Sequence, residues 1–212
     1  MKKEETNKLI DILKATYPDA KCSLDFTTPF ELVVAVMLSA QCTDERVNLT
    51  TPTLFAKCKT IQDFANIDLT ELENIIHPCG FYKNKAKNIK KCATQVLENF
   101  NGQVPCNMDD LLTLAGVGRK SANVILLEVF GIANGIAVDT HCKRISNRIG
   151  LSNQTDPSKI EHDLLKQIDF SNLKDINHLL MWHGRYCCTA RSPKCNTCPI
   201  NSFCKTFKKD EH

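Results

Sequence analysis

The stretch Leu114-Ala115-Gly116-Val117-Gly118-Arg119-Lys120-Ser121-Ala122-Asn123 joins two amphipathic segments of the 212-residue chain. Residues 109–115 and 120–130, which overlap its two ends, place apolar side chains at helical spacing. Two glycines one residue apart allow a tight turn between these segments. The amides that open the second helix lack partners inside that helix, so together with the glycines they suit a phosphate group. The stretch predicts two helices joined by a turn that can bind an anion, although a simple turn explains the glycines equally well.

Helical spacing continues along the chain on both sides of this stretch, and no convincing run of alternating residues indicates a strand. Apolar residues make up 42% of the chain and charged residues 24%, which excludes a disordered protein. The connections between the helical segments are short. The sequence therefore predicts an all-α protein with helices near residues 8–13, 68–76, 84–100, 109–115, 120–130, 139–149, 156–168 and 173–183.

Cysteine is the compositional outlier, with 12 residues in the chain. Four of them form the pattern Cys188-x6-Cys195-x2-Cys198-x5-Cys204, in a loop too short to hold a core of its own. Four thiolates suit either tetrahedral zinc or an iron–sulfur cluster. Zinc sites usually combine two closely spaced cysteine pairs, and this loop has only one, so the spacing favours [4Fe–4S] over zinc or over four thiols without metal. The adjacent Cys187 leaves the identity of the first ligand open.

The remaining eight cysteines (12 minus 4) are scattered and predict small hydrophobic side chains rather than ligands. They lie at positions 22, 42, 58, 79, 92, 106, 142 and 187. The N-terminus is charged and is followed by no apolar signal segment. The longest apolar stretches, residues 32–40 and 124–138, are too short or too interrupted to span a bilayer. We therefore expect a soluble intracellular protein with no membrane partner, in which thiols stay reduced.

The net charge of +3 is too small to indicate a partner, but the charges are unevenly distributed. Residues 83–91 and 176–209 contain no Asp or Glu. A single charge run is usually a solvated face, whereas two such stretches in one chain favour a polyanionic partner. The basic residues of the two stretches are Lys83, Lys85, Lys87, Lys90, Lys91, Arg185, Arg191, Lys194, Lys205, Lys208 and Lys209.

Lys120 and Asp139 each allow a structural and a chemical interpretation. Lys120 is either a second phosphate contact or an amine nucleophile that forms a Schiff base, and burial at a helix N-terminus beside Arg119 would favour the neutral, nucleophilic amine. Asp139 is either the N-cap of the helix that follows it or a carboxylate acting as a general base or electrostatic stabiliser.

Taken together, these features resemble the endonuclease III family, bifunctional DNA glycosylases of the helix-hairpin-helix superfamily. The resemblance covers nearly all of the chain, and its pieces run in the family's order. They are Met37-Leu38-Ser39-Ala40-Gln41-Cys42-Thr43-Asp44, Gly80-Phe81-Tyr82-Lys83-Asn84-Lys85-Ala86, Leu114–Lys120, Val138-Asp139-Thr140-His141, and His183-Gly184-Arg185-Tyr186 leading into the four-cysteine loop.

The resemblance implies two helical lobes that flank a DNA-binding cleft. A six-helix domain would span residues 22–132 and contain the helix-hairpin-helix at about residues 108–130. An iron–sulfur domain would join residues 1–21 to 133–212, with the cluster loop at 188–204. Lys120 and Asp139, from different lobes, would then meet across the cleft.

The resemblance also assigns roles to single residues. Lys120 matches the Schiff-base lysine, Asp139 matches the catalytic aspartate, and Cys188 rather than Cys187 matches the first ligand of a [4Fe–4S] cluster. The remaining ligands would be Cys195, Cys198 and Cys204. The implied DNA contacts are Gln41, Phe81, Gly116, Val117, Gly118, Arg119, Arg191 and Lys194.

The implied activity is base excision repair. The protein would remove oxidised pyrimidines from double-stranded DNA and cleave the strand 3′ to the abasic site by β-elimination. It would be a monomer in the cytoplasm, associated with the nucleoid. Three alternatives stay open: an adenine or mismatch glycosylase of the same superfamily, which usually lacks the hairpin lysine; a non-catalytic DNA-binding iron–sulfur module; and an iron–sulfur electron carrier.

Overall fold

The protein is helical throughout the part of the chain that the structure describes. The structure is a computed structural model that describes residues 1–210, and no strand occurs within that range. The predicted all-α class is confirmed. The chain forms two compact units, one made of Met1–Cys22 and Ile132–His212 and the other of Ser23–Gly131. None of the helices described is long and apolar enough to cross a membrane.

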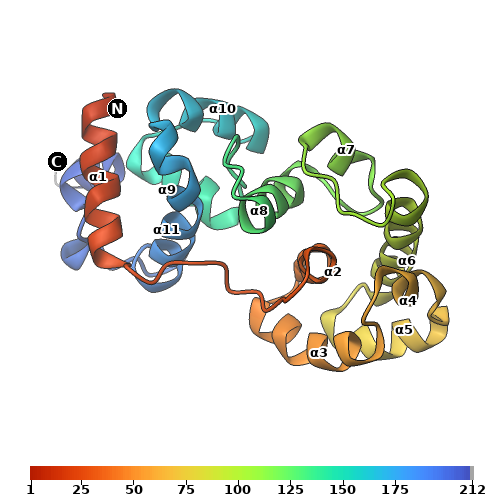
Figure 1. The fold of residues 1–212 in the computed structure, drawn as a ribbon. Helices are drawn as coiled ribbons and strands as arrows, with labels where there is room; N and C mark the ends of the chain where they lie inside the picture. The colour runs from red at the N-terminus through yellow and green to blue at the C-terminus, as the bar shows by residue number, and fades with distance from the viewer. Residues whose placement is uncertain (211–212) are drawn as a thin grey trace. The chain divides into compact units, whose positions relative to one another are not determined.

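The unit Ser23–Gly131 is built around one buried helix, α2 (Figure 1). Every residue from Phe30 to Leu38 is buried, and α2 packs against α3, α6 and α8. Seven α-helices lie in this unit, where six were expected, and two of them are only six residues long. They are α2 (Pro29–Ser39), α3 (Asp44–Lys57), α4 (Ile61–Asn66), α5 (Leu69–Ile76), α6 (Tyr82–Asn99), α7 (Met108–Thr113) and α8 (Arg119–Phe130), with a 3-10 turn η1 (His77–Cys79) before α6.

The start of α2 is fixed by local sequence. The Thr28 side chain accepts a hydrogen bond from the Glu31 amide, and the Glu31 carboxylate in turn accepts from the Thr28 amide. Pro29 occupies the first helical position, where its missing N–H costs nothing. This capping box sets where α2 begins. The helix ends at Ser39, two residues before Gln41.

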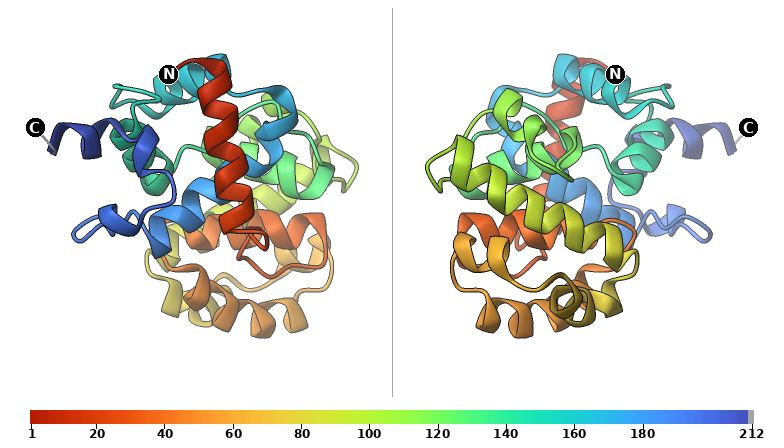
Figure 2. Two further views of the ribbon diagram at one scale, coloured as in Figure 1. Left: turned by 90° about the vertical axis from the view of Figure 1, so that its left-hand side faces the viewer. Right: turned by 90° about the vertical axis from the view of Figure 1, so that its right-hand side faces the viewer.

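The second unit brings the N-terminal helix α1 against the C-terminal part of the chain (Figure 2). Helix α1 packs on α11, and α11 packs on α9. The Lys14 amine lies 2.8 Å from the Asp175 carboxylate, which adds an ion pair to this contact. The elements are α1 (Lys3–Thr16), α9 (Thr140–Ile149), α10 (Pro157–Gln167), η2 (Phe170–Asn172), α11 (Leu173–Tyr186), η3 (Cys195–Thr197), η4 (Asn201–Phe203) and α12 (Lys205–Asp210).

Gly184 allows α11 to approach α9 closely. A Cβ atom at this position would lie 2.5 Å from His141 Nδ1 and 2.9 Å from Ile145 Cδ1, both of which are on α9. Real Cβ atoms do not come this close to other atoms, so the two helices can pack in this way only around a glycine. The contact places the end of α11, and the cysteines that follow it, beside α9.

Candidate nucleic-acid interface and iron–sulfur loop

The predicted turn between α7 and α8 forms, and its two glycines have different roles. Gly116 has a φ of +79°, and a Cβ atom there would lie 3.0 Å from Asn88 Cβ. Gly118 has an extended backbone, and a Cβ atom there would meet nothing within 4 Å. The fold therefore requires glycine at position 116 but not at position 118. Open space around Gly118 leaves room for an external group to approach the backbone.

Lys120 lies in the first turn of α8, two residues after Gly118. Gly118 is the N-cap of α8, and no side chain caps this helix. The first amides of a helix have no partner inside it, so this end of α8 favours an anion. The Lys120 side chain is exposed. The condition of burial attached to the nucleophilic interpretation of Lys120 is therefore not met.

Gln41 and Phe81 share an unusual backbone conformation. Their φ angles are +53° and +48°, in the left-handed region that non-glycine residues rarely adopt. Both side chains are exposed, and Phe81 keeps 64% of its surface accessible. A left-handed residue costs about 1–2 kcal/mol, and an exposed phenyl ring gains little from burial. Strain and exposure together indicate a functional position for Phe81.

The structure brings three predicted DNA-contact residues to one pocket. Gln41, Phe81 and Gly116 line a cavity of about 170 Å³, although they come from three different loops. Asn84 and Asn88 of α6 also line it, and sequence reasoning missed both. Asn84 and Asn88 are four residues apart, so their side chains lie on the same face of α6, the helix that begins directly after Phe81. This spacing is the sequence signal that could have identified them.

The lysines near the start of α6 do not form one solvated face. Lys85 is buried, and its amine donates to the Leu38 carbonyl at 2.8 Å and the Cys79 carbonyl at 2.9 Å. Lys90 is half-buried and donates to the Ala65 and Ile67 carbonyls. Burial lowers the pKa of Lys85. The other three lysines of the run, Lys83, Lys87 and Lys91, are exposed.

Asp139, in the other unit, is the N-cap of α9. Its carboxylate accepts a hydrogen bond from the Cys142 amide at 2.7 Å. The side chain is half-buried, so one carboxylate can cap the helix and still be reached. The structural interpretation of Asp139 is therefore correct, and it is compatible with a chemical role.

The four predicted ligand cysteines line one cavity in the loop after α11. Its volume is about 130 Å³, and Cys188, Cys195, Cys198 and Cys204 all contribute to its wall. All four side chains are half-buried, and none forms a disulfide. Four thiols around one cavity are the donor set that an iron–sulfur cluster requires. The residues present therefore fit the group.

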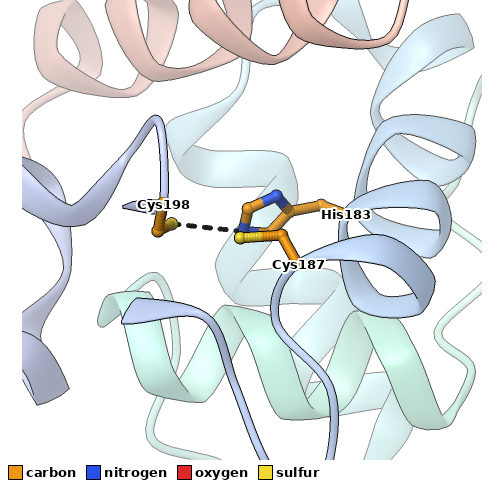
Figure 3. Close-up of side chains that lie close together, drawn as sticks. All are labelled: His183, Cys187 and Cys198. Atoms are coloured by element: carbon orange, nitrogen blue, oxygen red, sulfur yellow. Dashed lines mark hydrogen bonds between the residues drawn. The ribbon is translucent and has the colours of Figure 1, made fainter. Parts of the chain in front are cut away.

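Cys187 and His183 also line this cavity. Their side chains face Cys198 (Figure 3). The ligating atoms of His183, Cys187 and Cys198 lie within 4.8 Å of one another. His183 Nε2 lies 3.6 Å from Cys198 Sγ, and its Nδ1 lies 3.1 Å from the hydroxyl of Tyr17, the C-cap of α1. Burial lowers the pKa of His183 to about 4, so the ring is neutral at neutral pH. A neutral ring has one N–H to donate and one nitrogen to accept.

Two arginines of α9 hold the beginning of the cysteine loop. Arg144 donates to the Cys188 carbonyl at 3.0 Å and to the Gly184 carbonyl at 3.0 Å. Arg148 donates to Cys188 Sγ at 3.4 Å and to the Thr189 carbonyl at 2.7 Å. Helix α9, which begins at Asp139, is therefore tied directly to the cysteine loop. Sequence reasoning missed both arginines, although residues 140–155 contain no Asp or Glu.

The chain is similar to known base excision repair proteins over most of its length. Residues 34–169 match the family described as "HhH-GPD superfamily base excision DNA repair protein". The chain is 48% identical over 203 residues to endonuclease III of Synechocystis sp., covering 96% of this chain and 93% of that protein. It is 43% identical over 201 residues to endonuclease III of Bacillus subtilis, covering 94% and 91%.

This chain belongs to the endonuclease III family. A solved structure of a trapped endonuclease III–DNA covalent intermediate has a TM-score of 0.94 and 40% identity, with all of both chains covered. The structure of a thermostable thymine-DNA glycosylase, at 20% identity and a TM-score of 0.86, shares the fold. The predicted resemblance and the predicted fold are confirmed.

The family also accounts for the cysteine loop. Residues 188–204 match the iron–sulfur binding domain of endonuclease III, so the predicted [4Fe–4S] cluster is the cofactor of this loop. The match begins at Cys188 and leaves Cys187 outside it.

The other cysteines of this endonuclease III family member differ in accessibility. Cys92 and Cys142 are buried, and burial raises the pKa of each to about 12, so both stay as thiols. Cys106 is exposed and does not follow the prediction of a packed hydrophobic side chain. Arg191 and Lys194 are exposed on the cluster loop.

Proposed function

We propose that this chain removes oxidised pyrimidines from duplex DNA and then cleaves the strand, with Lys120 as nucleophile and Asp139 as assisting carboxylate. One observation carries the assignment: the family's hairpin ends in an exposed lysine at an uncapped helix N-terminus. The similar protein that was trapped as a covalent intermediate with DNA supports the same chemistry. An adenine or mismatch glycosylase does not need this lysine.

The first step is access to the damaged base. A base stacked in a duplex is out of reach, and moving it into a pocket costs a few kcal/mol. Gln41 and Phe81 fill the gap that the base leaves, which offsets part of this cost. The exposure and left-handed backbone of both residues support this role.

The second step is covalent. The Lys120 amine attacks C1′ of the sugar, the glycosidic bond breaks, and its electron pair leaves with the base, which takes up a proton. The Asp139 carboxylate stabilises the positive charge that develops on the sugar. Opening of the sugar ring gives an imine between Lys120 and C1′. The imine acidifies the C2′ protons, and loss of one of them expels the 3′ phosphate.

The hairpin and the cluster loop hold the DNA backbone. The amides at Gly116, Gly118 and Arg119 suit a phosphate, and such contacts do not depend on base sequence. The Val117 amide donates to the Leu114 carbonyl at 3.1 Å, so Val117 supports the turn rather than the phosphate. We propose Cys188, Cys195, Cys198 and Cys204 as the cluster ligands. When bound, the cluster supplies a covalent cross-link that holds the loop in shape. Arg191 and Lys194 then face phosphates from this loop.

The two compact units support the two proposed domains, residues 22–132 and residues 1–21 with 133–212. We propose that each domain carries different site residues. The first carries the hairpin and Lys120, and the second carries Asp139 and the cluster loop. Because the substrate is chromosomal DNA, we place the protein in the cytoplasm at the nucleoid, and we propose that it works as a monomer.

Borohydride trapping tests the assignment, since it reduces an imine to a stable amine. The wild-type protein is expected to form a covalent complex with a duplex that contains an oxidised pyrimidine, and Lys120→Gln to form none. Equal trapping of Lys120→Gln would show that another amine is the nucleophile and that the proposal is wrong.

The role of Asp139 is tested with a variant that keeps the helix N-cap but removes the negative charge. Asparagine caps helices as well as aspartate does, so Asp139→Asn should unfold at the wild-type temperature, whereas Asp139→Ala should lose about 1 kcal/mol of stability. Base release by Asp139→Asn should fall by roughly 100-fold, as expected for the loss of one group that stabilises the charge of the transition state. Wild-type base release by this variant would leave Asp139 as a cap alone.

A further inference from the structure

Lys85 connects the two loops that carry Gln41 and Phe81. The Leu38 carbonyl, which accepts from the Lys85 amine at 2.8 Å, lies three residues before Gln41. The Cys79 carbonyl, which accepts at 2.9 Å, lies two residues before Phe81. A single nitrogen atom therefore fixes the distance between two chain segments that are far apart in sequence.

Burial of the Lys85 amine costs free energy, which a contact that only stabilised the fold would avoid. Lys85 is only 6% exposed, and burying an ammonium group costs several kcal/mol unless it is well paired. Leu38 lies in the last turn of α2, where helix carbonyls lack internal partners and favour a positive charge. The two carbonyls therefore offset part of the cost of burying the ammonium group. The interaction adds little to the stability of the protein, but it links the two loops rigidly.

Both linked loops hold strained residues. The left-handed backbone of Gln41 and of Phe81 persists only where the surrounding structure fixes it. Gln41, Phe81 and Lys85 also line the same pocket, with Gly116 of the hairpin. The amine is therefore placed where it can fix the relative positions of the two exposed side chains.

We propose that Lys85 is a positioning residue for base flipping, because it fixes the spacing between Gln41 and Phe81 before DNA is bound. This inference rests on the proposed gap-filling roles of those two side chains. It assigns Lys85 no contact with the reacting atoms. Its effect should therefore be confined to substrates from which a base must be flipped.

Lys90 provides a matched control on the same helix. Its amine also donates to two backbone carbonyls, those of Ala65 and Ile67, but these lie at the end of α4 rather than in the two loops. Lys85→Met and Lys90→Met each remove one charge and two hydrogen bonds from α6. A difference in activity between the two variants is therefore caused by the lost link between the two loops, and not by the loss of a lysine from α6.

The experiment compares two substrates under single-turnover conditions with the full-length protein and its cluster. One is a duplex with a single oxidised pyrimidine, and the other is a single-stranded oligonucleotide with an abasic site, which needs no flipping. Lys85→Met should slow base release from the duplex by about 10- to 100-fold, the range expected for a misplaced group. Imine trapping on the single strand should be unchanged, and Lys90→Met should match the wild type on both.

Fluorescence of 2-aminopurine beside the lesion supplies a second measurement, since it rises when the stack opens. Lys85→Met should lose this rise and Lys90→Met should keep it. Equal effects of the two variants, or equal loss on both substrates, would overturn the proposal. If Lys85→Met does not fold, Lys85→Gln replaces it, because the shorter amide cannot reach both carbonyls. Unfolding of both variants would also overturn the proposal, since Lys85 would then hold the fold itself.

Failure of the proposed function would give a different result. In that case the wild-type protein would neither release the base nor be trapped on either substrate, whatever residue occupies position 85.

Discussion

Gly116 and Gly118 show at the scale of single residues how a motif combines fold and function. Gly116 is required by its left-handed backbone and by its contact with Asn88. Gly118 has neither constraint. A glycine that the fold does not need, at the N-terminus of a helix, is best explained by something that must approach the backbone.

This contrast gives a prediction for two single substitutions. Gly116→Ala should lower the free energy of unfolding by at least about 1–2 kcal/mol, the cost of a left-handed residue. Gly118→Ala should cost less than about 1 kcal/mol, because alanine is only a poorer N-cap. Its affinity for a duplex with a stable abasic analogue should nevertheless fall, since the added methyl group separates the amides from the phosphate.

Thermal unfolding and fluorescence anisotropy with labelled duplex measure the two effects separately. Wild-type affinity of Gly118→Ala would mean that the second glycine serves only the turn.

At the scale of elements, α2 shows why some helices were absent from the sequence prediction. Its residues from Phe30 to Leu38 are buried on every side, so the helix has no polar face and no period of 3.6 residues. Helix α4 has only six residues, too few for periodicity to be visible. The helices α6, α8, α9 and α10 each have one buried face, and their predicted bounds agree with the structure to within about two residues.

Helix α9 is the element that joins Asp139, the proposed assisting carboxylate, to the cluster loop. It begins at Asp139, and its Arg148 donates to Cys188 Sγ and to the Thr189 carbonyl. The loop is bound at its other end too, since the Thr206 hydroxyl donates to the Arg148 carbonyl at 2.9 Å. The cluster loop therefore supports α9 as well as the basic residues on its surface.

We expect Arg148→Met to weaken retention of iron. Removing the guanidinium takes away its hydrogen bonds to the Thr189 carbonyl and to Cys188 Sγ, a proposed ligand atom, which frees the start of the loop. The rate of iron loss to a chelator should rise several-fold, as followed by the visible absorption of the cluster. The matched control is Arg191→Met, whose exposed side chain should affect DNA affinity but not iron. Equal iron loss from both variants would contradict this role of Arg148.

At the scale of the whole molecule, the net charge of +3 is a poor guide to binding. Some basic residues are neutralised within the protein, as Lys3 is by Asp169 and Lys8 by Glu4. Others, such as Arg191 and Lys194, are exposed in a stretch without acidic residues. Where the charges lie therefore matters more than their sum.

The salt dependence of duplex binding tests this distribution. Each phosphate contact contributes about 0.9 to the slope of log affinity against log salt concentration. The double variant Arg191→Gln/Lys194→Gln should therefore reduce the slope by roughly 2 if both residues contact phosphates. The control Lys3→Gln/Lys8→Gln removes the same charge from residues that are already paired. An unchanged slope in the first double variant would exclude both phosphate contacts.

The amino-acid sequence alone is enough to predict the helical class, the hairpin, the four-cysteine loop and the family. These features depend on local order and spacing, which a chain carries whether or not it is folded. Only the tertiary structure showed that Lys85 and Lys90 hold backbone carbonyls, that Gln41, Phe81 and Gly116 share a pocket, and that two arginines of α9 hold the cysteine loop. From sequence alone a lysine on a helix is expected to be exposed to solvent, and only packing shows that it is buried. Nothing in the sequence predicts a left-handed backbone at a glutamine or a phenylalanine. Contacts of this kind join residues remote in sequence, so they are fixed only when the chain packs.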